Sequence, residues 1–118
     1  MNAVEYIMRG LEYKIKGEHN AAIKEFTSAI ELDPKNEDAY AFRGFEYGKL
    51  DEWDKAISDY TQAITINPRD SDYLSRGGAY FMIEKFKEAR SDLETALRLN
   101  PNNNEAKEAM ALLRSTGH

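Results

Sequence analysis

The chain carries one pattern three times, and this internal repeat constrains the fold more than any other feature of the sequence. The second copy runs from Ala39 to Pro68; altered copies precede it, from Glu5 to Pro34, and follow it, from Asp72 to Pro101. The first step between copies is 34 residues and the second is 33. A period of this size is typical of solenoids, in which each unit packs only against its neighbours. The sequence therefore predicts a stack of three similar units.

Small, aromatic and apolar residues recur at fixed places in each copy, always in the same order. The recurring anchors are Gly10, Gly44 and Gly77; Tyr13, Tyr47 and Tyr80; Ala22, Ala56 and Ala89; Phe26, Tyr60 and Leu93; Ala29, Ala63 and Ala96; Pro34, Pro68 and Pro101. Within each copy the apolar residues are spaced by three and four, which is the period of an α-helix and not of a strand.

Each copy is expected to form two helices, and the end of the chain one more. The expected ranges are 3–16, 20–32, 37–50, 53–66, 71–83, 86–99 and 104–115. Gly17 is placed to end the first helix in the manner of a C-terminal glycine. Ser71 is expected to be the N-cap of the fifth helix, next to Asp72. The last helix has an apolar side, Ala106, Ala109, Met110 and Leu113, and is expected to cap the stack.

The order of these anchors resembles the tetratricopeptide repeat family, and the resemblance covers nearly the whole chain. It implies an all-α, right-handed superhelix of three helix-turn-helix repeats plus a capping helix, in one domain spanning 1–118. The repeats would be about 3–36, 37–69 and 70–102, with the capping helix at 104–115. The resemblance is specific for the fold but implies no particular partner, because this fold hosts unrelated functions.

Two further patterns concern packing between the helices of a unit. The glycine and first alanine anchors are expected where the two helices cross closely, with no room for a larger side chain. Each copy also has an arginine before the glycine and an acidic residue sixteen positions later: Arg9 with Glu25, Arg43 with Asp59, and Arg76 with Asp92. We expect three ion pairs within the units. The alternative is a ladder of arginines that binds anions.

Composition excludes several classes of function. The net charge of −5 argues against a phosphate-binding surface, so a nucleic-acid partner is not expected. With no cysteine there is no disulfide or thiolate site. No apolar stretch is long enough to span a bilayer, and no secretory signal is evident, so we expect no membrane partner and a cytoplasmic location.

No catalytic, cofactor-binding or metal-binding residues can be proposed. No nucleophile, base and orienting acid form a recognisable set, and no phosphate-binding loop or EF-hand motif is present. His19 lies where the other copies have Trp53 and Phe86, so it is expected to pack as a partly exposed aromatic residue. We therefore predict that the protein is not an enzyme.

In the resembled family, the first helix of each repeat lines a concave groove. Several positions of these helices that are not assigned to the core carry apolar residues, which would make the groove apolar: Ile7, Leu11, Phe42, Phe45, Leu74 and Phe81. Contiguous apolar surface of this kind usually has a binding role. The alternative is that several of these side chains turn inward and belong to the core.

Some members of the family hold the acidic C-terminal tail of heat-shock chaperones with a clamp of lysine, asparagine and arginine side chains. The matching positions here are Ile7, Leu11, Phe42, Ser71 and Ser75, and none supplies the required donor. A terminal carboxylate would find no charge-assisted hydrogen bond there. The sequence thus predicts a module that is not of this carboxylate-clamp type.

Together these observations predict a non-catalytic adaptor or scaffold that binds a protein segment, apolar or amphipathic, in its concave groove. The alternative is self-association. The first helix has no neighbour on its outer side, and Val4, Ile7 and Met8 would be partly uncovered there, which favours a homo-oligomer.

Overall fold

The computed structural model describes all residues, 1–118, and contains seven α-helices and no strand. The helices are α1 (Ala3–Ile15), α2 (His19–Leu32), α3 (Glu37–Lys49), α4 (Trp53–Ile66), α5 (Asp70–Met82), α6 (Phe86–Leu99) and α7 (Asn104–Ser115). The all-α prediction is confirmed, and each helix begins and ends within one residue of its predicted bounds. None of the helices combines the length and the apolar character that crossing a membrane requires.

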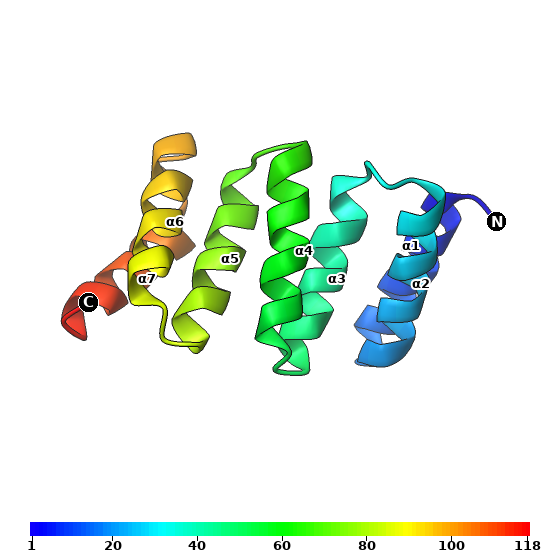
Figure 1. Ribbon diagram of the computed structural model, residues 1–118, viewed down its shortest axis with the longest axis horizontal. Helices are drawn as coiled ribbons and strands as arrows, with labels where there is room; N and C mark the ends of the chain where they lie inside the picture. Colours follow the sequence, from blue (N-terminus) through cyan, green and yellow to red (C-terminus); the bar gives the residue numbers. More distant parts are fainter.

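The helices stack side by side along the longest axis of the molecule, with the two termini at opposite ends (Figure 1). The most extensive contacts join α1 to α2, α3 to α4, and α5 to α6, which are the three units. The second helix of each unit then packs on the next helix along the chain. The resulting body is elongated, with extents of 47 × 25 × 21 Å.

The helices of each unit cross where the sequence places its glycines. A Cβ atom added at Gly10 would collide with the buried ring of Phe26. At Gly44 it would lie 3.1 Å from the Asp59 Cβ and 3.2 Å from the Ala56 carbonyl oxygen. Both distances are shorter than an ordinary van der Waals contact, so the predicted close crossing is confirmed.

Gly17 follows the C-cap of α1 and has a φ of +74°, as its predicted role at the helix end requires. The positions equivalent to Gly17 in the next two units are Asp51 and Glu84, which have φ values of 59° and 62°. The same left-handed turn therefore joins the helices of all three units, although only the first unit uses glycine for it.

The start of α5 differs from the prediction. The helix begins at Asp70, so the expected N-cap role of Ser71 is wrong. The Asp70 carboxylate instead accepts hydrogen bonds from the side-chain amides of Asn100 and Asn103, at 3.0 and 2.9 Å. These bonds lower the pKa of Asp70 and attach the start of α5 to the turn before α7.

The last helix covers the apolar end of the stack, as predicted. Ala106, Met110 and Leu113 are buried and Ala109 is half-buried. They join a cluster with three buried residues of α6: Ala89, Leu93 and Ala96. Without α7 this side of α6 would face water.

We expect opposite effects on stability from the same substitution at two helical glycines. Gly78→Ala should raise the free energy of unfolding by about 0.5–1 kcal/mol, because glycine disfavours a helix interior and the new Cβ would meet nothing within 4 Å. Gly10→Ala should lower it by roughly 1–3 kcal/mol, because the new Cβ collides with the Phe26 ring. Urea unfolding followed by circular dichroism measures both changes. A stabilised Gly10→Ala variant would contradict the close crossing.

Candidate binding surface

The odd-numbered helices line one side of the molecule. α3 contacts α5 and α5 contacts α7, whereas no pair of even-numbered helices makes contacts of that extent. In a curved stack the helices on the inner side approach one another, so the odd-numbered helices lie on the concave side. We call the surface formed by α1, α3, α5 and α7 the odd-helix face.

The six predicted groove residues lie at the boundary between core and surface. Phe45 is exposed, at 40% of its full accessible surface. The other five are half-buried: Ile7, Leu11, Phe42, Leu74 and Phe81. None is fully buried, and all come from odd-numbered helices.

Two of the predicted groove aromatics also pack against the second helix of a unit. The Phe42 ring stacks on the buried Phe26 ring, with the centroids 5.6 Å apart. The Phe81 ring meets the edge of Phe86 at 5.4 Å. Phe42 and Phe81 therefore belong partly to the core, as the alternative interpretation expects, and each side chain is also partly exposed to solvent.

An apolar pocket of about 330 Å³ opens between α5 and α7, and we call it the α5–α7 pocket. Its lining includes Leu74, Gly78, Phe81 and Met82 from α5, and Leu112 from α7. Met82 and Leu112 are each 53% exposed at its rim. Gly78 leaves space in the wall, since nothing lies within 4 Å of where its Cβ would be.

A second pocket, also about 330 Å³, lies one unit earlier, and we call it the Phe45 pocket. Its lining residues are Phe45, Gly48, Lys49, Asp51, Trp53 and Tyr60. For four of these, Phe45, Gly48, Lys49 and Tyr60, the residue 33 positions later lines the α5–α7 pocket: Gly78, Phe81, Met82 and Leu93. The repeat therefore builds the same hollow twice and gives each hollow different side chains.

The Phe45 pocket differs from the α5–α7 pocket in having charged residues in its lining, Lys49 and Asp51. The Lys14 ammonium group of α1 lies 4.5 Å from the centroid of the Phe45 ring, and the Lys49 ammonium group lies 5.1 Å from it. Cations are attracted to the electron-rich face of an aromatic ring at such distances. Neither lysine takes part in an ion pair; the basic residues that do are Arg9, His19, Arg43, Lys55, Arg69 and Arg76.

All three predicted arginine–acid pairs are present, but they differ in geometry. Arg43 donates two hydrogen bonds to the carboxylate of Asp59, at 2.9 and 2.8 Å, and Arg76 donates two to Asp92, both at 2.8 Å. The Arg9 guanidinium group lies 3.8 Å from the Glu25 carboxylate, farther than in the other two pairs, and the Arg9 side chain is 48% exposed. The hydrogen bonds with Asp59 raise the pKa of Arg43, so its charge is held at any ordinary pH.

The two well-formed pairs also join neighbouring units. Arg43 donates a third hydrogen bond to Thr27 of α2, at 3.1 Å, and Arg76 donates one to Thr61 of α4, at 3.2 Å. Arg9 makes no corresponding hydrogen bond to a threonine; its guanidinium group instead donates to the Met1 sulfur at 3.2 Å. With their donors used in this way, Arg43 and Arg76 serve the structure, and the observed contacts favour the ion pairs over the anion-binding ladder.

His19 is half-buried, as expected, but its partner was not anticipated. Its Nδ1 lies 3.2 Å from Oε2 of Glu46, a carboxylate that is fully buried between the first two units. The other Glu46 oxygen has no hydrogen-bond partner. The contact spans 27 residues of sequence, and the pattern of the repeat contains no signal for it.

Leu112 is the main groove residue that the sequence analysis missed. The three copies in the sequence end at Pro101, so the repeat pattern assigns α7 only the role of a cap. Extending the alignment by one unit places Leu112 at the position of Phe45 and Gly78, which are its equivalents on α3 and α5. That alignment would have added Leu112 to the predicted groove.

Comparison with protein families identifies the repeat. A family model described as TPR repeat matches residues 10–51, and two described as tetratricopeptide repeat match residues 37–70 and 72–103. No curated protein matches the chain.

Several solved structures share the fold over nearly the whole chain. The first TPR of Spaghetti (RPAP3), bound to the HSP90 peptide SRMEEVD, is 30% identical, with a TM-score of 0.94 over 98% of this chain and 92% of that one. The Arabidopsis OM64 TPR domain is also 30% identical, with a TM-score of 0.93 over 97% and 95%. The second TPR domain of human RPAP3, in complex with the HSP70 peptide SGPTIEEVD, is 30% identical, with a TM-score of 0.91 over 95% and 94%.

We expect Arg43→Ala and Arg9→Ala to differ sharply in stability. Removing Arg43 leaves the Asp59 carboxylate, whose side chain is 4% exposed, without its partner, so the free energy of unfolding should fall by about 3–5 kcal/mol. Removing the exposed Arg9 should cost about 0–1 kcal/mol. Thermal and urea unfolding of the two variants measure the difference. Equal, small losses would show that the Arg43 pair does not hold the units together.

Proposed function

The chain belongs to the tetratricopeptide repeat family, and from that membership we propose that it is a non-catalytic adaptor module that binds a segment of another protein along its odd-helix face. The observation that carries this proposal is the open, apolar α5–α7 pocket, with Met82 and Leu112 exposed at its rim. Protein cores are close-packed and rarely leave a hollow of this size, whereas pockets of this size and lining are typical of binding sites.

The shape and chemistry of the odd-helix face favour a peptide or an amphipathic helix as the partner. Its two hollows recur at the spacing of the repeat, so a regular segment can place side chains in both. Around them lie exposed and half-buried apolar residues, and burying their surface against a partner is favourable through the hydrophobic effect. Met8 and Met82 add unbranched side chains that adapt to different partner shapes.

The peptide-bound structures are at odds with the expectation that this chain is not of the carboxylate-clamp type. Two of the similar domains hold acidic chaperone peptides, SRMEEVD and SGPTIEEVD. We nevertheless propose that this chain does not clamp a terminal carboxylate, because the five clamp positions carry no amide, amine or guanidinium group. These positions are Ile7, Leu11, Phe42, Ser71 and Ser75.

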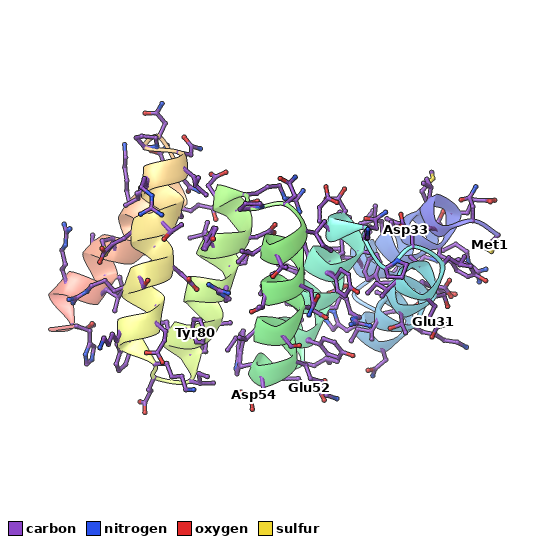
Figure 2. All side chains as sticks on the ribbon, turned by 45° about the horizontal axis from the view of Figure 1, so that its top comes forward. Met1, Glu31, Asp33, Glu52, Asp54 and Tyr80 are labelled. Carbon is purple, nitrogen blue, oxygen red and sulfur yellow. The ribbon has the colours of Figure 1, made fainter.

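Self-association is the second candidate function, and the free side of α1 favours it. Val4 and Met8 are each 60% exposed, and no helix packs on this edge of the stack. Figure 2 shows the side chains on the ribbon, with Met1 at this free edge. In that case a second copy would be the partner. The cytoplasmic location expected from the sequence stays a prediction.

Filling the α5–α7 pocket should abolish binding without unfolding the protein. We expect Gly78→Trp to place an indole in the pocket, since Gly78 lies in its wall with open space beside it. Gly78→Ala, which adds only a methyl group, is the matched control. The measurement is selection from a library of random twelve-residue peptides displayed on phage, followed by binding of the selected sequences to both variants.

The proposal predicts peptides that bind wild type and Gly78→Ala but lose at least roughly tenfold in affinity for Gly78→Trp, which corresponds to about 1.4 kcal/mol. Circular dichroism spectra and melting curves check that all three proteins are folded. Selected peptides that bind Gly78→Trp as tightly as wild type would place the binding site elsewhere.

Amidating the C-terminal carboxylate of a chaperone peptide should change its affinity for this chain little. We expect the peptide SRMEEVD, if it binds, to change its affinity by less than about twofold when its C-terminus is amidated, because the clamp positions offer no charge-assisted donor. Fluorescence anisotropy with both forms of the peptide measures this. A tenfold or larger loss on amidation would show that the chain does clamp a terminal carboxylate.

A further inference from the structure

We infer that the α5–α7 pocket receives the side chain of a phenylalanine carried by the partner segment. The ring enters beside Gly78, in the space of the side chain that this residue lacks. This inference rests on the proposed function and names the anchor residue of the partner.

The repeat leaves out one large side chain at this place. The positions equivalent to Gly78 on the other odd-numbered helices are Leu11, Phe45 and Leu112, which are all large and apolar. Gly78 lines the α5–α7 pocket, and a Cβ added to it would meet nothing within 4 Å. The pocket therefore includes the space beside α5 in which the other odd-numbered helices carry a leucine or a phenylalanine.

The size of the pocket fits an aromatic ring. An engineered protein cavity of about 150 Å³, lined by leucine, isoleucine and phenylalanine side chains, binds benzene. The α5–α7 pocket has about 330 Å³, so it holds a benzyl group and leaves room for the atoms that join the ring to a peptide backbone. Met82 and Leu112 are exposed at its rim, so a ring can enter from outside the molecule.

The lining of the pocket selects against polar side chains. All nine lining residues are leucine, glycine, phenylalanine, methionine or alanine, so no side chain there can pair with a charge or accept a hydrogen bond strongly. A charged side chain would lose its water without compensation. The O–H of a tyrosine, at the tip of the ring that goes deepest, or the N–H of a tryptophan would lose a hydrogen bond as well. A phenylalanine ring has no polar atom and avoids this cost.

Two of the lining side chains favour an aromatic ring over an aliphatic side chain. The Phe81 ring meets the edge of Phe86 and also lines the pocket, where it can make a further edge contact with a ring. Such aromatic pairs gain more than their buried area alone provides. Met82 adds a thioether sulfur, which also interacts favourably with aromatic rings. Leucine lacks both interactions.

Toluene and p-cresol, the side-chain analogues of phenylalanine and tyrosine, test the pocket without any peptide. Toluene at millimolar concentration should shift the NMR signals of the Met82 and Leu112 methyl groups, and p-cresol should bind at least roughly fivefold more weakly. Gly78→Phe should abolish the toluene shifts. Phe45→Leu, at the equivalent position of the Phe45 pocket, is the matched control and should keep them. Absent toluene shifts, or equal binding of the two compounds, would overturn the inference.

The stability of Gly78→Phe tests whether the pocket holds the space of a phenylalanine side chain. Its ring should lie in the α5–α7 pocket and bury apolar surface there, so the variant should melt at a higher temperature than Gly78→Ala. Gly78→Ala shares the gain from removing a helical glycine and adds no ring. A lower melting temperature for Gly78→Phe would show that the pocket does not accommodate the ring.

The peptides selected on phage test the anchor residue directly. Those whose binding Gly78→Trp abolishes should carry a phenylalanine at one shared position. Replacing this phenylalanine by alanine should weaken binding at least roughly tenfold, by tyrosine roughly fivefold or more, and by leucine about two- to tenfold. Fluorescence anisotropy with the synthetic peptides measures these changes, and replacement of a neighbouring peptide residue by alanine is the control.

The outcomes separate this inference from the proposed function. If Gly78→Trp abolishes the binding of peptides that are anchored by leucine, tyrosine or tryptophan, the proposed function stands and the inferred phenylalanine is wrong. If Gly78→Trp changes the binding of no selected peptide, the pocket is not the binding site and both fail. If toluene converts a dimer of the free protein into monomers, a second copy of the chain fills the pocket, and the inferred partner segment is wrong.

Discussion

The close crossing of two helices at a glycine is the constraint on which the rest of this structure depends. Gly10, Gly44 and Gly77 let the first helix of each unit approach the second so closely that a methyl group there would meet its backbone or a buried ring. The crossing fixes the rotation of the first helix about its own axis. The residues that directly follow the crossing glycines, Phe45 and Gly78, are thereby turned away from the crossing and line the two pockets.

Coupling between the units comes from a second device, the bidentate arginines. Arg43 and Arg76 each bind an acidic residue of their own unit and a threonine of the preceding one. Arg9 makes a longer, more exposed contact with Glu25. A solenoid whose units interact only with their neighbours is weakest at its ends. At one end of the stack α7 packs on α6, whereas α1 contacts only α2 to a comparable extent.

The sequence was sufficient to predict the helices, the crossings and the three ion pairs, because all of these follow from the repeat itself. Features that break the repeat were not predictable in this way. The helix α5 begins one residue earlier than predicted, at Asp70, whose carboxylate accepts hydrogen bonds from Asn100 and Asn103, which lie 30 and 33 positions away. The approach of Lys14 to Phe45 depends on how α1 is placed against α3, and a pattern along one helix carries no such information.

The most direct test of this account is the molar mass of the free protein, measured by light scattering from micromolar to near-millimolar concentration. If the odd-helix face is open and available to a partner, the measured mass stays close to 13.5 kDa at every concentration. A stable dimer in which Phe45 and Leu112 are protected from solvent would contradict it, because a second copy of the chain would then occupy the surface assigned to the partner.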